Sequence, residues 1–548
     1  MIFNNDVKQG GMPGSGQGQG AFYTPARAST PPPAPRRRVL RTLLIVALIL
    51  VLVSGAIATA ALVYTDGAQL RVRIGNQQSA LIDLRQSIPV SPYLLGTNVF
   101  PATGTPGPDP SGNGFMSYGT QITNGLRSAR VKLLRFPGGD WGELHAYSFD
   151  QLNAFSTLLG QTNAGGMIQA PLSAVNGQTD TLASRASNAG LIVDYMNNKN
   201  SIQRAGKYVR APFHPVAFWT VGNEPDRLNN PDTGLPYTVD DYVKAFIQFS
   251  TAMHQNDPTI QVFGPEISQF YGVGSGPSDA AGKLWMEGFL KGVSDYERLH
   301  PTLRYHLLDG VSFHRYQFDD ARQAPALLLS STGEWNYLLP PLRQLIRQDF
   351  GRDIPLALTE VNTNPGKTAA SSPPRALAAV WWADTLGRLM SQQVAYVAFF
   401  SAEGVDSPYP LFTTNGLQQT PMLRVMQLFA RLQRNFVPVQ VQSEPVSVYA
   451  TQDDAQQTVS LLFVNKSNMT QQAQVSTEGG SLPVSPLAQW PGLQINLSAY
   501  SVTVVTLRRN AGADAYSFAA PTGAQSTPAL VRTVCGNQSN ALLNTTSC

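Results

Sequence analysis

The feature that most constrains the fold is a repeated alternation between Leu94 and Phe436 of short β-rich runs with longer helical patterns. Helical patterns such as 238–255 carry acidic residues where a helix dipole begins. This alternation predicts an α/β fold, a (β/α)8 barrel over residues 91–436. An open doubly wound sheet is the alternative, but no glycine fingerprint joins a first strand to a helix. The predicted strands are 94–99, 131–136, 166–170, 216–222, 260–264, 310–316, 354–360 and 394–400.

Beyond the barrel the hydrophobic pattern changes to a period of two. Residues 437–508 therefore predict an appended antiparallel β-sandwich, and 69–90, which also alternate, are expected to add a strand to it. Residues 509–548 are rich in Ala, Ser, Thr, Asn and Gly and are expected to form a flexible tail. The tail holds both cysteines, Cys535 and Cys548. A disulfide between them is expected in an oxidising compartment, although two free thiols fit the sequence equally well.

The N-terminal residues predict a membrane anchor. Residues 1–42 are expected to form a disordered, basic tail, and 43–64 contain no charge. At about 1.5 Å per residue this apolar segment is long enough to cross a hydrocarbon core of about 30 Å as a transmembrane helix. Arginines precede the segment, so the tail is expected in the cytoplasm and the chain after about residue 66 outside the cell. A cleaved signal peptide is the alternative, but its apolar region is usually shorter.

The bulk composition limits the class of partner. The chain is 43% hydrophobic and 14% charged, with a formal net charge of +4. That excess is too small for a nucleic-acid footprint, so no nucleic-acid partner is expected. None of the histidines stands in an HExxH or similar spacing, so neither a catalytic metal nor a cofactor is predicted.

Two predicted strands end on carboxylates. Glu224 follows the run 216–222 and Glu360 closes the run 354–360. In a barrel the reactive groups lie at the carboxyl ends of the strands, and strands four and seven are nearly opposite. Two carboxyls that face each other across such a cleft are what glycosidic bond hydrolysis requires.

These residues carry a resemblance to a known group of enzymes. The sequence around Asn223, Glu224 and Glu360 resembles the retaining (β/α)8 glycoside hydrolases of clan A, with an Asn-Glu-Pro after strand four and a Glu on strand seven. The stretches 133–143 (LLRFPGGDWGE) and 311–318 (VSFHRYQF) are similar to arabinofuranosidase/xylosidase-like and heparanase/β-glucuronidase-like members. The resemblance covers roughly residues 69 to 508, and an appended sandwich recurs in those families.

The resemblance implies roles for individual residues. Glu224 is expected to be the general acid/base and Glu360 the nucleophile, with Asn223 on the sugar 2-hydroxyl. Arg135 is expected to support the nucleophile and keep it ionised, so that the pKa of Glu360 stays low while that of Glu224 is raised. The other expected substrate contacts are His314, Tyr316, Asp140 and Trp141.

Four other residues compete for a role at the site. Glu266, after strand five, is a rival acid, a substrate contact or a rim residue. Trp381 and Trp382 offer apolar platforms for sugar, although their helical setting predicts that at least one packs against the barrel. Glu403, after strand eight, points into the cleft or is solvated.

The sequence thus predicts a membrane-anchored extracellular retaining glycoside hydrolase. Its substrate is expected to be a glycoside, oligosaccharide or polysaccharide, and its membrane partner the lipid bilayer around residues 43–64. The alternative is a membrane-tethered carbohydrate-binding protein with a catalytically silent barrel. Which sugar is bound depends on loop residues that the pattern does not place.

Overall fold

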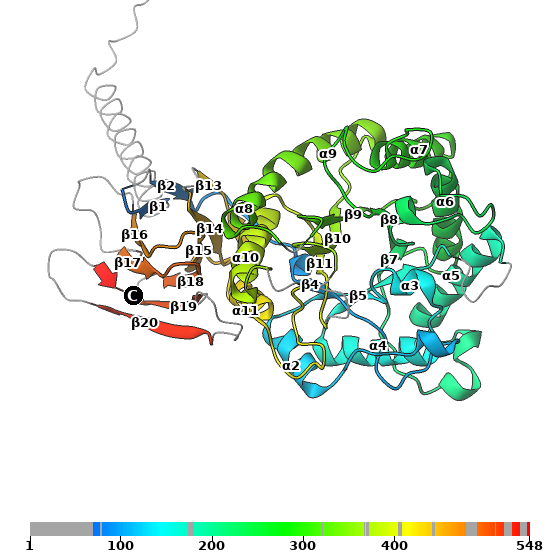
Figure 1. The fold of residues 1–548 in the computed structure, drawn as a ribbon, viewed down its shortest axis with the longest axis horizontal. Helices are drawn as coiled ribbons and strands as arrows, with labels where there is room; N and C mark the ends of the chain where they lie inside the picture. Colours follow the sequence, from blue (N-terminus) through cyan, green and yellow to red (C-terminus); the bar gives the residue numbers. More distant parts are fainter. Residues whose placement is uncertain are drawn as a thin grey trace, which may run out of the picture. The chain divides into compact units, whose positions relative to one another are not determined.

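A computed structural model describes residues 69–76, 79–173, 180–320, 322–366, 368, 372–403, 408–440, 444–477, 490, 492–509, 511–519, 529–537 and 545–547 (Figure 1). The predicted transmembrane helix at 43–64 lies outside these residues. Within them, every helix is too short or too polar to cross a bilayer.

The predicted (β/α)8 barrel is confirmed. Eight parallel strands close in the order β10-β11-β4-β5-β6-β7-β8-β9, and each predicted run supplies one of them. Along the chain they are β4 Gly96–Asn98, β5 Leu133–Phe136, β6 Gly165–Ala170, β7 Phe218–Val221, β8 Gln261–Ile267, β9 Gly310–Tyr316, β10 Leu356–Asn362 and β11 Tyr396–Phe399.

Helices surround the barrel strands (Figure 1). Polar caps fix where several begin: Thr238 and Asp241 form a capping box at the start of α6, as Ser148 and Gln151 do for α4. The helices are α2 Thr120–Ser128, α3 Trp141–Leu144, α4 Phe149–Thr162, α5 Leu182–Asn197, α6 Val239–Asn256, α7 Trp285–Leu299, α8 Pro325–Ser330, α9 Trp335–Phe350, α10 Arg375–Ser391 and α11 Pro421–Phe429.

Side chains fill the inside of the barrel. Leu133, Met167, Phe218, Phe263 and Tyr396 form a buried cluster separate from the core between strands and helices. Gly310 leaves room for it, because a Cβ there would lie 2.1 Å from the Phe263 ring. The barrel is therefore a packed core rather than a pore, and polar chemistry is confined to its carboxyl end.

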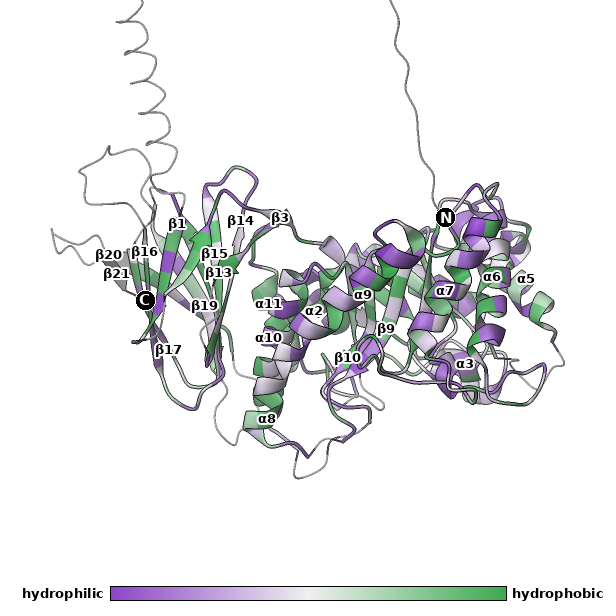
Figure 2. Ribbon diagram, turned by 90° about the horizontal axis from the view of Figure 1, so that it is seen from above, coloured by the Kyte–Doolittle hydropathy of each residue, from purple (hydrophilic) through white to green (hydrophobic). Residues whose placement is uncertain are grey.

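Antiparallel strands form the second part of the fold, which fits the predicted sandwich. Their hydrogen-bonded order is β13-β2-β1-β16-β17-β21-β20-β19-β18-β15-β14-β12-β3, and their inner faces share one apolar cluster, part of which is green in Figure 2. The segment before the barrel supplies β1 Gln69–Ile74, β2 Ala80–Asp83 and β3 Ile88–Pro89. The others are β12 Asn435–Val437, β13 Val439–Gln440, β14 Val446–Gln452, β15 Thr458–Asn465, β16 Gln471–Thr477, β17 Gly492–Leu497, β18 Ser501–Arg508, β19 Ala513–Ala519, β20 Val531–Asn537 and β21 Thr545–Ser547.

The C-terminal segment 509–548 differs from the expected flexible tail. It contributes β19, which pairs with β18 along seven residues from Ser501↔Ala519 to Leu507↔Ala513, and then β20 and β21. Ala513, Ala515 and Phe518 of β19 are buried, but the Ala, Ser, Thr and Asn residues around these strands weaken the apolar pattern in the sequence. Cys535 in β20 is disulfide-bonded, and Cys548 lies outside the described residues.

A buried ion pair joins α10 to the sheets. The Lys466 Nζ atom lies 2.9 Å from Asp384 Oδ2, and the Tyr449 hydroxyl donates to Asp384 Oδ1 at 2.6 Å. Burial raises the pKa of Asp384, but Lys466 and Arg388 outweigh it and lower the pKa to about 2. This carboxylate is therefore ionised and fully enclosed, a state that depends on its partners.

We expect Asp384→Ala to destabilise the protein by about 3–5 kcal/mol, because it leaves the buried Lys466 ammonium without its buried partner and with the exposed Glu444 carboxylate in its place. Thermal denaturation measures the loss. Asp240→Ala is the control, since Asp240 forms an exposed pair with Lys283 whose loss changes stability little. Equal melting temperatures for the two variants would show that the pair of Asp384 and Lys466 does not stabilise the contact between α10 and the antiparallel strands.

Candidate active site

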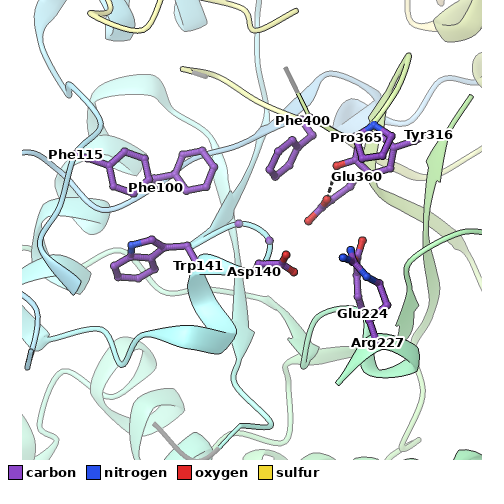
Figure 3. A pocket seen from close by; sticks show the side chains of 13 residues that line it. Phe100, Phe115, Asp140, Trp141, Glu224, Arg227, Tyr316, Glu360, Pro365 and Phe400 are labelled. Atoms are coloured by element: carbon purple, nitrogen blue, oxygen red, sulfur yellow. Dashed lines mark hydrogen bonds and ion pairs between the residues drawn. The ribbon is translucent and has the colours of Figure 1, made fainter. Parts of the chain in front are cut away.

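The carboxyl ends of the barrel strands bring the predicted residues together around a cavity of about 230 Å3 (Figure 3). Glu224 follows β7, and Glu360 lies in β10, two residues before that strand ends. Nearest oxygens of the two carboxylates and His314 Nδ1 all lie within 4.8 Å of one another. The described cavity wall consists of Phe100, Phe115, Gly138, Gly139, Asp140, Trp141, Glu224, Arg227, Tyr316, Glu360, Pro365, Gly366 and Phe400.

Glu360 is held by two donors. Its Oε1 accepts from Arg135 Nη1 at 2.9 Å, and its Oε2 accepts from the Tyr316 hydroxyl at 2.6 Å. Gly139 adjoins the carboxylate at φ +72°, and a Cβ on it would lie 3.2 Å from Glu360 Oε1. A glycine at this position thus suits both the left-handed turn and the close approach of the carboxylate.

Glu224 lies in the turn that follows β7, three residues after that strand ends. Its backbone is left-handed, with φ 45° and ψ 54°, and Pro225 begins a 3-10 helix, η6 Pro225–Arg227. The Glu224 amide donates to the Glu266 carbonyl at 2.9 Å, which fixes this strained turn to the neighbouring strand. The turn aims the carboxylate at the cavity, where its Oε2 pairs with Arg227 and its Oε1 lies 3.0 Å from His314 Nδ1.

Arg135 connects the residues behind the cavity. Its fully buried guanidinium donates to Glu360 at 2.9 Å, Glu266 at 2.7 Å, and Asn98 and Asn223 at 2.8 Å each. Burial lowers the pKa of Arg135, but the two glutamates outweigh burial and raise it. One cation from β5 thus fixes side chains from β4, β8 and β10 and from the turn after β7.

His314 is surrounded by carboxylates. It is fully buried, with Nε2 3.4 Å from Glu266 and Nδ1 3.0 Å from Glu224 and 3.6 Å from Glu360. Burial lowers its pKa, but the three carboxylates outweigh burial and raise it to about 10. His314 is therefore a cation at neutral pH. It does not line the cavity, so a direct sugar contact does not fit its position.

The expected pKa asymmetry of the two glutamates is reversed in this structure. Burial raises the pKa of Glu360, and the neighbouring His314 and Arg135 do not fully offset it. Burial also raises the pKa of Glu224, but its hydrogen bond to His314 and its ion pair with Arg227 outweigh burial and hold this pKa below the usual range. The expected asymmetry rested on Arg135 near Glu360 alone, whereas Arg227 and a protonated His314 also lie beside Glu224.

The remaining predicted contacts lie at the rim. Asp140 lines the cavity and accepts from Asn223 Nδ2 at 3.1 Å, while Asn223 itself is buried. Desolvation by the surrounding protein, together with the Glu224 carboxylate, raises the pKa of Asp140 although its surface is partly open to solvent. Trp141 forms one end of the cavity with Phe100 and Phe115 (Figure 3), an apolar wall of the kind that packs against sugar faces.

The competing residues do not line the cavity. Glu266 is fully buried, and its Oε1 accepts from the Thr359 hydroxyl at 2.9 Å while Oε2 binds Arg135, so it positions the other groups. Trp381 and Trp382 are both fully buried in α10, so neither is a platform for sugar. Glu403 is neither solvated nor in the cavity, because it is buried and accepts from the Ser117 amide at 3.0 Å.

Sequence reasoning missed three contributors. Asn98 ends β4 and Gln169 lies in β6, and both accept from Arg135. Their positions at strand ends were a usable signal, because neighbouring strands present such side chains to one point. Arg227 gave no such signal, since an arginine in a turn is usually a solvated charge.

The carboxylates and His314 form a group with the spacing of metal ligands. The donor set does not suit a cation. Arg227 and Arg135 already neutralise the two carboxylates, and the imidazole carries a proton where a metal would need a free lone pair.

Comparisons with known proteins agree with the fold. No family model and no curated protein sequence matches the chain. The GH51 arabinofuranosidase from Xanthomonas axonopodis pv. citri aligns over 80% of this chain and 99% of its own, with 14% identity and a TM-score of 0.55. The α-L-arabinofuranosidase from Thermotoga maritima aligns over 81% and 92%, with 15% identity and a TM-score of 0.53. A Paenibacillus polymyxa xyloglucanase of glycoside hydrolase family 44 covers 82% and 95%, with 12% identity and a TM-score of 0.51.

At these identities the similarity is one of fold. The chain has the barrel fold of the clan A glycoside hydrolases, as its resemblance to them predicted.

The buried His314 predicts a pH dependence of stability. Because its pKa is raised from 6.5 to about 10, its stabilisation is complete below pH 6.5 and is lost as the pH rises through about 10. Melting temperature measured from pH 6 to 10 should fall more steeply for the wild type than for His314→Asn. His300→Asn, at an exposed histidine, is the control and should follow the wild type. Parallel curves for His314→Asn and the wild type would show that His314 is not protonated in the folded protein.

Proposed function

We propose that this chain is a retaining glycoside hydrolase with Glu360 as nucleophile and Glu224 as general acid/base. The observation that carries the proposal is the convergence of these two carboxylates across one cavity, with nearest oxygens within 4.8 Å. Retaining enzymes hold their carboxyl groups about 5–5.5 Å apart, too close for an intervening water. The shared fold with arabinofuranosidases and a xyloglucanase supports a carbohydrate substrate.

In the first step Glu360 attacks the anomeric carbon. The bond to the leaving oxygen breaks as Glu224 donates a proton to that oxygen. Glu224 is an anion in the free site, so it must first bind a proton, and its contact with the exposed Arg227 must loosen. Tyr316 and Arg135 hold Glu360 in position for attack.

In the second step Glu224 takes a proton from water, whose oxygen attacks the anomeric carbon. The bond to Glu360 breaks, and the carboxylate leaves with its electron pair. Arg135 donates to Glu360 Oε1 and so favours the charge that returns there. The product keeps the anomeric configuration of the substrate.

Location is a further part of the proposal. An uncharged segment at 43–64 preceded by arginines supports a single-pass anchor with the barrel outside the cell. Membrane fractionation, with protease added to intact cells, tests it. A barrel that resists protease until the cells are opened would contradict an outer location.

Glu360→Ala should lower kcat by about 10⁴-fold or more, because no covalent intermediate can form, and azide should restore part of the activity. The assay is hydrolysis of a panel of aryl glycosides, including furanosides and uronides. Glu403→Gln is the matched control, because Glu403 also follows a barrel strand but lies outside the cavity.

Normal turnover by Glu360→Ala would contradict the assignment. If the wild type binds sugars but hydrolyses none of the panel, the chain is the carbohydrate-binding protein with a silent barrel instead.

Glu224→Ala should slow hydrolysis least for aryl glycosides with the best leaving groups. Such groups depart without a proton, so they need the general acid least. Rates across phenols of graded acidity measure this dependence. An equal loss for every phenol would mean that Glu224 does not protonate the leaving oxygen.

A further inference from the structure

The ion pair on Glu224 includes the one cation of the described cavity wall that solvent reaches. The Arg227 guanidinium pairs with Glu224 Oε2, and the Arg227 side chain is 60% exposed while that of Glu224 is 7% exposed. Figure 3 shows the two side chains together on the side of the cavity away from Phe100 and Phe115.

The other two cations of the site cannot exchange partners. Arg135 has no exposed side-chain surface and contacts two carboxylates and two asparagines, and His314 is equally enclosed. Only Arg227, among the described residues at the cavity, can release its carboxylate and accept one from a ligand.

The charges around Glu224 explain why that exchange matters. The cations Arg135, His314 and Arg227 face the three carboxylates of Glu224, Glu266 and Glu360, with Asp140 near Glu224 at the rim. An anionic ligand on Arg227 removes one cation from Glu224 and adds a negative charge beside it. Glu224 then favours its protonated form, which is the form that can act as an acid.

The position of Arg227 indicates which part of the substrate it meets. The general acid has to face the leaving oxygen, and Arg227 binds the carboxylate of that acid. Arg227 therefore lies on the leaving-group side of the scissile bond.

We propose, on the basis of the function above, that Arg227 selects substrates whose leaving group carries a carboxylate, such as a uronic acid residue. The substrate carboxylate replaces Glu224 Oε2 on the guanidinium, and the released Glu224 binds one proton from solvent. That proton goes to the glycosidic oxygen as the bond breaks, so charge and protons balance. A neutral leaving group lacks this exchange and leaves Glu224 paired with Arg227.

The test uses matched leaving groups on the glycone that the aryl-glycoside panel identifies. The 3-carboxyphenyl glycoside is compared with its methyl ester, for the wild type, Arg227→Gln and Arg227→Lys. The wild type should favour the acid by about tenfold or more in kcat/KM, Arg227→Lys should keep part of that preference, and Arg227→Gln should lose it. Arg322→Gln, at an exposed arginine outside the cavity wall, is the control and should behave as the wild type.

The pH profile of kcat separates this role from a structural one. In the wild type the alkaline limb for the acid should lie at higher pH than that for the ester, because Glu224 stays protonated longer beside the bound carboxylate. In Arg227→Gln the alkaline limbs of the kcat profiles for the acid and for the ester should lie at the same pH.

Three results would overturn the inference: equal kcat/KM for acid and ester in the wild type, an unchanged preference in Arg227→Gln, or a preference for uronide glycones alone. In each case hydrolysis itself still supports the proposed function. If no glycoside is hydrolysed, titration calorimetry that compares the binding of glucuronate with that of its methyl ester tests whether Arg227 binds a carboxylate. Tighter binding of glucuronate that requires Arg227 and takes up about one proton supports the carboxylate site, and equal binding of both overturns it.

Discussion

A single buried guanidinium organises the carboxyl end of this barrel. A charge that is withdrawn from water is tolerated only where partners surround it. Arg135 meets this requirement with side chains from β4, β8 and β10 and from the turn after β7. The same contacts that satisfy the arginine hold Glu360 against the cavity and Glu266 behind it.

The second constraint is the turn at Glu224. Its left-handed backbone and the following proline end β7 abruptly, and the amide bond to Glu266 ties the turn to β8. The buried cluster of Leu133, Met167, Phe218, Phe263 and Tyr396 fills the inside of the barrel. The carboxylates therefore meet only at the open end, where the aromatic wall and Arg227 define two different sides of the cavity.

Much of the fold could be predicted because local pattern and topology agree. Eight apolar runs separated by helical patterns predict eight parallel strands, and eight such strands close into a barrel. Arg135, Glu224 and Glu360 lie at or just after the ends of these runs. The strands after residue 509 escaped prediction because the Ala, Ser, Thr and Asn residues of this segment weaken the apolar pattern, although Ala513, Ala515 and Phe518 are buried in the structure. Trp381 and Trp382 were ambiguous because a helix can be buried on every side, as α10 is.

The electrostatics of the site could not be predicted from sequence, because they depend on contacts between distant residues. His314 becomes a cation only because carboxylates from three other segments surround it, and Glu224 stays ionised because His314 and then Arg227 lie against it. The most direct measurement of the central claim is trapping with a 2-deoxy-2-fluoro glycoside of the sugar that the protein hydrolyses. If Glu360 is the nucleophile, mass spectrometry of the peptide that contains β10 should find one glycosyl group attached to Glu360. Attachment to any other residue, or a product of inverted configuration, would contradict this assignment.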